Sequence, residues 1–199
     1  MDDQTLAFYA AEAEAYADLV TGDFGRIWLE RFAERLPQGA RVLDWGAGHG
    51  WAAAWLRDQG FAVEATDGSE DLAAVGRTRF GLEVRVEPFG ALDAEAAFDG
   101  LWSSFALLHV PRARFAGHLA QAARALRPGG LLYLGLKEGT GEARDRLGRH
   151  YTYFGRGDLA AALAAAGFEP PEILGDQAMG MAGAAEPCLH AYAILGPRS

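Results

Sequence analysis

The sequence of 199 residues contains a single cysteine, Cys188, which excludes an internal disulfide. We interpret this cysteine as a small buried side chain rather than a reactive thiol. No apolar run approaches the roughly 18 to 20 residues that a helix needs to span a bilayer. The first twenty residues are acidic, whereas a signal peptide begins with basic residues. These absences predict a soluble, cytoplasmic protein that has no membrane partner.

Positive charge is also scarce. Lys137 is the only lysine, the formal net charge is −9, and no segment is rich in Lys and Arg. Proteins that bind nucleic acids need clustered cations to neutralise phosphates. The sequence therefore predicts no nucleic-acid partner. His118, His150 and His190 show no paired spacing, so we also predict no metal site.

Apolar strands alternate with helices along most of the chain. Three helices end at a glycine turn that leads directly into an apolar strand, which is typical of crossover connections in a parallel sheet. The pattern predicts a doubly wound α/β fold with a mostly parallel, seven-stranded, Rossmann-like sheet. We expect strands at 41–45, 61–66, 82–87, 99–105, 131–137, 168–174 and 189–196, with helices at 51–59, 69–80, 111–126 and 158–166.

Before the first strand, residues 6–20 carry one apolar stripe at steps of three and four, which predicts an amphipathic helix. A second helix is expected at 24–36, ending at Pro37. With no linker or repeat, we expect a single domain over 1–199, in which a helical N-terminal lid or extension (1–38) precedes the α/β core (39–199).

The first predicted strand ends in a glycine-rich turn, VLDWGAGHG. Gly46, Gly48 and Gly50 stand at every second position, whereas a dinucleotide fingerprint has the spacing G-x-G-x-x-G. Asp44 lies two residues before the turn, where a carboxylate repels a pyrophosphate and attracts a cation. The spacing and the acid together favour a ligand with an ammonium or sulfonium group.

A second acid ends the next predicted strand. Asp67 lies about 20 residues past the glycine turn, where an acid is the expected partner of ribose hydroxyls. A ligand with both a cationic end and a ribose fits S-adenosylmethionine. NAD fits only the second requirement.

These features resemble a known family. VLDWGAGHG, the acid in TDGS, FDGLWSSFALLHVP and ALRPGGLLYLGL together are similar to the class I S-adenosylmethionine-dependent methyltransferases, in particular the small-molecule type. The resemblance covers residues from about 40 to 174. It implies the Rossmann-like methyltransferase fold, S-adenosylmethionine as cofactor and methyl transfer to a small-molecule substrate. The Pro-Pro motif of adenine-methylating enzymes is absent, because SSFA occupies its position.

The resemblance also implies roles on the methionine side of the cofactor. The backbone of Gly46, Ala47 and Gly48 would face the methionine moiety, while Asp44 helps to bind its amine. Ser104, at the end of the fourth strand, would pass close to it.

On the adenosine side, Asp67 would bind the two ribose hydroxyls, with Gly68 and Ser69 close to adenine. Glu87 and Phe89 would border the ring. The proline between them has no N–H to donate, so Phe89 would take that role or the contact is lost.

Two residues are candidates for catalysis. His109 follows the fourth strand at the ligand-binding edge, where it could act as a general base near neutral pH. A structural role, bonding the backbone at a helix start, is the alternative. Tyr151 is the second candidate and lies in the segment 137–158.

Four residues are candidate substrate contacts. Tyr9 and Tyr16 face one way on the first helix, which either packs in the core or closes over the site. Lys137 and Arg149 belong to the segment 137–158, which is either a solvated loop with a short helix or a substrate cap. Cations there would suit an anionic substrate, although nearby acids weaken that argument.

Two alternatives stay open at this point. One is an NAD-dependent oxidoreductase, which the position of Asp44 and the glycine spacing disfavour. The other is a non-catalytic cofactor-binding module of the same fold.

Overall fold

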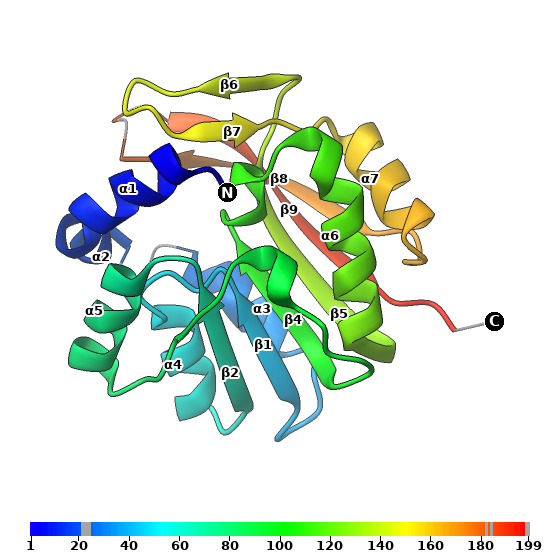
Figure 1. Ribbon diagram of the computed structural model, residues 1–199. Helices are drawn as coiled ribbons and strands as arrows, with labels where there is room; N and C mark the ends of the chain where they lie inside the picture. Colours follow the sequence, from blue (N-terminus) through cyan, green and yellow to red (C-terminus); the bar gives the residue numbers. More distant parts are fainter. Residues whose placement is uncertain (21–24, 182, 184, 198–199) are drawn as a thin grey trace.

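The computed structural model describes every residue except 21–24, 182, 184 and 198–199. Its centre is a seven-stranded sheet with helices on both faces (Figure 1). The strand order is β3-β2-β1-β4-β5-β9-β8. The strands are β1 (Arg41–Trp45), β2 (Ala62–Asp67), β3 (Arg85–Val86), β4 (Phe98–Ser104), β5 (Leu126–Lys137), β8 (Glu172–Met179) and β9 (Ala185–Ile194).

The first five strands of the sheet run parallel, and β8 and β9 add an antiparallel edge. The predicted fold class is therefore confirmed. The order reverses between β1 and β4, which is the switch point where ligands bind in open α/β sheets. The carboxyl ends of β1, β2 and β4 bring Asp44, Asp67 and Ser104 to this edge.

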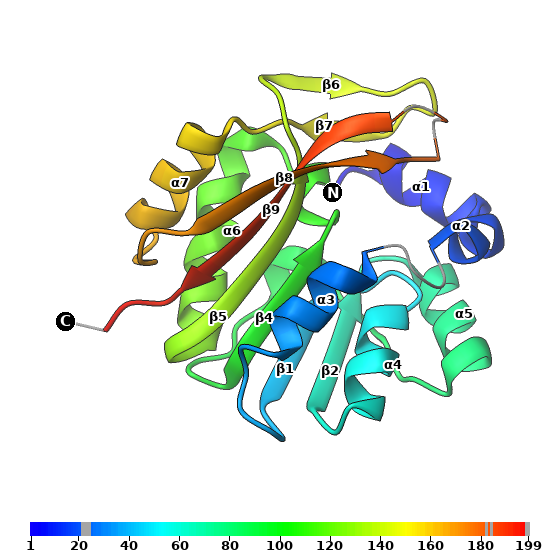
Figure 2. The same ribbon diagram turned by 180° about the vertical axis from the view of Figure 1, so that it is seen from behind.

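Helices cover the two faces in separate groups. One face carries α3 (Arg26–Ala33), α4 (Trp51–Asp58) and α5 (Glu70–Phe80), which Figure 2 shows in front of the sheet. The other face carries α6 (Arg112–Ala125) and α7 (Arg156–Ala165). Alternate residues of each central strand serve the two cores: Leu43 packs with α6 and α7, and Val42 with α3 and α4.

Capping residues explain where two of these helices begin. The Ser69 side chain accepts a hydrogen bond from the Leu72 N–H at 3.3 Å, which confirms the predicted cap of α5. Pro111 is the N-cap residue of α6, so the helix begins one residue later than expected. The predicted helix over 24–36 is shorter in the structure, and Phe24 lies outside the described residues.

The N-terminal region differs from the single helix expected over 6–20. It forms α1 (Asp3–Ala11) and α2 (Ala13–Val20), separated at Glu12, whose non-helical backbone has φ −110° and ψ 19°. Tyr9 and Ala17 pack against α5 through Leu72 and Val75. By contrast, α3, from the same predicted extension, packs against the main sheet. The division at residue 38 stays a prediction.

The segment after β5 is also different from the loop and short helix that we considered. It forms an antiparallel hairpin from β6 (Glu142–Arg144) and β7 (His150–Thr152). Two short 3-10 turns, η1 (Phe89–Ala91) and η2 (Leu107–His109), complete the elements. The hairpin lies beside α1 above the ligand-binding edge of the sheet (Figure 1).

Candidate active site

The turn between β1 and α4 forms the bottom of the site. Gly46, Gly48 and Gly50 have φ values of +82°, +58° and +75°, a region that side chains rarely adopt. A Cβ on Gly46 would lie 2.4 Å from the Ala106 Cβ and 2.9 Å from the Phe89 ring. The turn therefore needs glycine both for its backbone conformation and for its close packing.

Asp44 lies at the start of this turn and is only 2 % exposed. Its Oδ2 accepts a hydrogen bond from the Ala53 N–H at 3.2 Å. Burial, followed by the charge of Asp67, raises the pKa of Asp44 to about 8. No arginine pairs with this carboxylate within the described part of the chain, so a ligand cation would be its natural counter-charge.

Asp67 is bound by backbone amides. Its two carboxylate oxygens accept hydrogen bonds from Gly48 N–H and Ser69 N–H, each at 2.8 Å. Burial raises the pKa of Asp67, and these amides act in the opposite direction. The residue thus connects the glycine turn to the loop after β2. We call residues 44–50 and 67–69 the floor of the site.

Two adjoining cavities lie above the floor. Asp44, Ala47 and Trp51 line the larger one, and Gly48, Asp67 and Ser69 line the smaller one. Six residues line both: Tyr9, Tyr16, Gly46, Ser104, Phe105 and His109. Phe105 is one of the non-glycine residues with positive φ, at +52°. Strained backbone of this kind is concentrated at functional sites.

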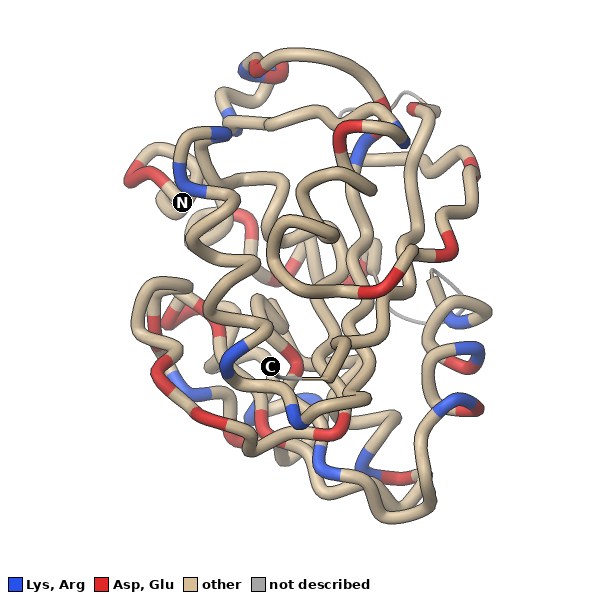
Figure 3. Tube along the Cα trace, turned by 90° about the vertical axis from the view of Figure 1, so that its right-hand side faces the viewer, with Lys and Arg blue, Asp and Glu red and all other residues tan. Residues whose placement is uncertain are grey.

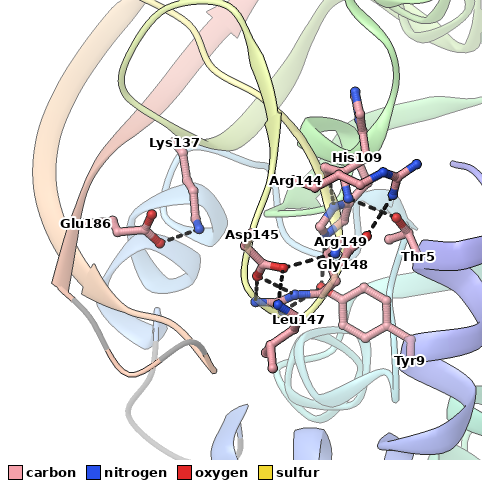
Figure 4. A network of polar contacts seen from close by, with 11 residues as sticks. Thr5, Tyr9, His109, Lys137, Arg144, Asp145, Leu147, Gly148, Arg149 and Glu186 are labelled. Carbon is pink, nitrogen blue, oxygen red and sulfur yellow. Dashed lines mark hydrogen bonds and ion pairs between the residues drawn. The ribbon is translucent and has the colours of Figure 1, made fainter.

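A network of polar contacts covers the larger cavity (Figure 4). The Tyr9 hydroxyl lies 2.9 Å from His109 Nε2 and accepts from Arg149 Nη1 at 3.3 Å. His109 Nδ1 lies 2.6 Å from the His150 carbonyl oxygen. Because a carbonyl only accepts, the proton is on Nδ1, and Nε2 accepts from Tyr9. Burial lowers the pKa of His109 to about 3, so the ring is neutral.

Further contacts join α1 to the hairpin. The His150 N–H donates to the Thr5 hydroxyl at 3.0 Å, and Thr5 is fully buried. At the outer edge, Arg144 Nη2 pairs with Asp2 Oδ2 at 2.8 Å. We call α1 and the β6–β7 hairpin the roof of the site.

The structure brings most of the predicted site residues to the cavities. Those that line one cavity or both are Asp44, Gly46, Ala47, Gly48, Asp67, Ser69 and Ser104 of the cofactor set, the candidates His109 and Tyr151, and the candidates Tyr9, Tyr16, Lys137 and Arg149. Their individual roles stay predictions.

Three residues that we predicted to bind the cofactor do not line the cavities within the described part of the chain. Gly68 lies next to Leu6 of α1, with 3.2 Å between a built Cβ and Leu6 Cδ2. Glu87 pairs with Arg85 at 3.2 Å. The Phe89 ring packs edge-on against Trp45 in the core, at a centroid distance of 5.3 Å. Gly68, Glu87 and Phe89 therefore do not belong to the lining of either cavity as the described residues form them.

Sequence reasoning missed part of the larger cavity. Its wall includes Met179, which ends β8, Met181 shortly after that strand, and Cys188 of β9. Cys188 is buried, as we predicted. His49, in the glycine turn, is also fully buried, and burial lowers its pKa to about 4. Nothing in the sequence pattern around Met179, Met181 and Cys188 indicates that these residues reach the site.

Comparison with known proteins agrees with this geometry. Residues 26–172 match the methyltransferase domain family. The chain is 37 % identical over 120 residues to methyltransferase GfsG of Streptomyces halstedii, which covers 54 % of this chain and 42 % of that protein. It is 32 % identical over 139 residues to dimethylglycine N-methyltransferase of Parasynechococcus marenigrum, covering 65 % and 48 %. The chain thus spans less than half the length of these curated relatives.

Solved structures are similar over nearly the whole chain. The 1,6-didemethyltoxoflavin-N1-methyltransferase of Burkholderia thailandensis, with bound 1,6-didemethyltoxoflavin and S-adenosylhomocysteine, is 26 % identical. Its TM-score is 0.78, and the match covers 98 % of this chain and 88 % of that one. Phosphoethanolamine N-methyltransferase 2 of Haemonchus contortus, in complex with S-adenosyl-L-methionine, shares the fold at 14 % identity, with a TM-score of 0.76 over 99 % and 61 % of the two chains. The chain therefore belongs to the methyltransferase domain family, and within it to the class I S-adenosylmethionine-dependent methyltransferases.

Proposed function

We propose that this chain transfers a methyl group from S-adenosylmethionine to a small-molecule acceptor. The observation that carries the proposal is the pair of buried acids, Asp44 and Asp67, beside a glycine turn that has no room for a side chain at Gly46 or Gly50. When bound, S-adenosylmethionine supplies an electrophilic methyl group, which leaves its bonding electron pair on sulfur. The acceptor atom forms the new bond with a lone pair and gives up a proton if it carries one.

The floor residues fit this cofactor. Asp44 is buried without an arginine partner among the described residues, so the positive methionine end would relieve its unfavourable burial. Asp67 has lone pairs beyond those used by Gly48 and Ser69, and these can accept from ribose hydroxyls. Gly46 and Gly48 let the main chain approach the ligand closely.

The roof residues would exclude water and orient the acceptor. Tyr9 of the roof and Tyr16 of the neighbouring α2 line both cavities together with Gly46. A Cβ on Gly48 would be 3.5 Å from Tyr16 Cε1. Methyl transfer gains from a dry site, because the sulfonium charge disperses as the methyl leaves. His109 has both ring nitrogens engaged, which supports a positioning role for it in this closed arrangement. Its role as a base stays a prediction.

Three observations support a small acceptor. The larger cavity is roofed by α1 and the hairpin, so the acceptor must fit beneath them. On the side shown in Figure 3, basic residues are interspersed with acidic ones, and the net charge is −9. Among the similar structures, one contains 1,6-didemethyltoxoflavin.

Within the described residues, no helix has the length and apolarity to cross a membrane.

The test is incubation with methyl-labelled S-adenosylmethionine and a bacterial extract from which macromolecules have been filtered. We expect label in small products. Calorimetry with S-adenosylhomocysteine and with NAD runs in parallel, and we expect only the former to bind. Label that enters only protein or nucleic acid, when unfiltered extract is used, would contradict the small acceptor.

Two further outcomes identify the alternatives. Binding of S-adenosylhomocysteine without transfer to any fraction would favour a non-catalytic module. Binding of NAD alone would overturn the proposal altogether.

A further inference from the structure

Two buried cations line the larger cavity. Lys137, at the end of β5, is 7 % exposed, and Arg149, next to β7, is 3 % exposed. Each is paired with an acid: Lys137 with Glu186, and Arg149 with Asp145 at 2.6 Å (Figure 4). Neither acid belongs to the cavity lining that the described residues form. Within the described part of the chain, both cations therefore line the cavity, whereas the acids that pair with them do not.

Tyr151 links these two cations. Lys137 Nζ lies 3.8 Å from the centre of its ring, and Arg149 Cζ lies 5.3 Å from it. The Tyr151 hydroxyl makes no hydrogen bond within the described residues, and burial raises its pKa, so it keeps its proton. This part of the cavity thus gathers two cations and a phenol, and all three can donate hydrogen bonds.

Aromatic rings form much of the remaining wall. Trp51 and Phe105 line the same cavity, as do Tyr9 and Tyr16 of the N-terminal helices. Met179 and Met181 close the side next to β8. Rings pack favourably against other rings edge-on or offset, and thioethers also make good contacts with them. A flat conjugated molecule suits these walls better than a polar, flexible one.

We propose that the methyl acceptor is a small aromatic acid, whose anionic group is bound by Lys137, Arg149 and Tyr151. This inference rests on the proposed methyl transfer and specifies its acceptor. An anion gains two charge-assisted contacts here, whereas a cationic acceptor would meet two like charges. Burial lowers the pKa of His109, and the charges of Arg149 and Lys137 lower it further. The His109 ring therefore lies close enough to both cations to be affected by them.

The test is calorimetry on the complex with S-adenosylhomocysteine, using three probes of similar shape: benzoate, uncharged benzamide and cationic benzylamine. We expect benzoate to bind at least about tenfold more tightly than benzamide. Benzylamine should bind most weakly. Equal or tighter binding of benzamide or benzylamine would overturn the inference, as would the absence of benzoate binding at millimolar concentration.

Variants of Lys137 test whether this cation causes the preference for benzoate over benzamide. Lys137→Met should weaken benzoate by about tenfold and leave benzamide unchanged. The double variant Lys137→Met/Glu186→Gln removes the ion pair without changing its summed charge, so a persistent loss assigns the effect to Lys137 itself. Lys137→Arg keeps the cation and should keep the preference. Arg127→Met, which removes an exposed cation paired with Asp99, is the matched control.

Binding of S-adenosylhomocysteine separates two kinds of failure. If it does not bind, the proposed function fails. If it binds and benzoate is not preferred, only the acceptor class is wrong.

Discussion

The floor and the roof of the site are built in opposite ways. The floor consists of two short loops after neighbouring strands, and its contacts are made largely by main-chain amides, as at Asp67. The roof consists of α1 and a hairpin far along the chain. Its hydrogen bonds join residues 100, 140 and 145 positions apart: Tyr9–His109, Tyr9–Arg149 and Thr5–His150.

This contrast separates two functions. A floor made of backbone and glycine depends little on side-chain choice outside its two acids, so it suits one unchanging cofactor. The roof depends on buried side chains that contact one another across distant segments, and a change in one of them alters the cavity beneath. Acceptor specificity is therefore expected to reside in the roof and in the ends of β5 and β8, and cofactor affinity in the floor.

The largest expected effect comes from the floor. Asp67→Ala should weaken S-adenosylhomocysteine binding by about 2 to 4 kcal/mol, since two charge-assisted hydrogen bonds to ribose are lost at about 1 to 2 kcal/mol each. Calorimetry measures this directly. Asp58→Ala, which removes an exposed carboxylate paired with Arg57, is the matched control and should bind normally. Unchanged affinity in Asp67→Ala would place the cofactor elsewhere.

In the roof, Tyr9→Phe should lower the free energy of unfolding by about 1 to 3 kcal/mol, because it leaves buried His109 Nε2 and Arg149 Nη1 without their shared partner. Urea denaturation measures the loss. Tyr153→Phe changes a half-buried tyrosine just after β7, outside the cavity lining of the described residues, and serves as the control. If the two variants lose the same stability, the Tyr9 network contributes nothing specific.

Asp44 of the floor also predicts that stability and ligand affinity depend on pH. The pKa of Asp44 is about 8 when folded and about 4 when unfolded. The stability that this group contributes is thus present below about pH 4 and is lost as the pH rises through about 8. A bound ammonium favours the carboxylate, so S-adenosylhomocysteine affinity should rise with pH up to about 8, by at most about tenfold per unit.

Asp44→Asn isolates this effect. The cofactor amine and Asp67 also titrate, so the expected signal is the difference in slope between the two proteins, measured by calorimetry from about pH 6 to 8, the upper part of the window between the two pKa values of Asp44. An identical slope in Asp44→Asn would mean that Asp44 does not sense the ligand charge.

The same contrast explains what could be predicted from the sequence. The strand, glycine turn and helix over 41–59 are fixed by neighbours in the chain, through an apolar run, positive-φ glycines and an alanine-rich helix. Asp44 and Asp67 could be placed because strands of a parallel sheet end at one edge. These parts of the fold and of the floor were therefore confirmed in position.

The roof could not be predicted in the same way. The hairpin strands have only three residues each, too few for a periodic signal, and Glu12 gives no local indication of a break between α1 and α2. The pairing of Tyr9 with His109, and the approach of Met179 and Met181 to the cavity, follow from packing between distant segments. Candidate residues could be named there, but their partners could not.

The smallest effect is expected at the outer edge of the roof. Asp2 Oδ1 accepts from the Thr5 N–H at 2.8 Å and caps α1, while its Oδ2 pairs with Arg144. Both side chains of the ion pair are about a third or more exposed, at 34 % and 42 %, so Arg144→Ala should cost less than about 1 kcal/mol of unfolding free energy. Asp2→Ala also removes the cap and should cost about 1 kcal/mol more. The pKa of Asp2 is lowered to about 2, so this contribution is fully present above about pH 4 and is lost as the pH falls through about 2. Urea denaturation of both variants ranks the contacts: if Arg144→Ala is as damaging as Tyr9→Phe, the roof is secured at its exposed edge and not by its buried network.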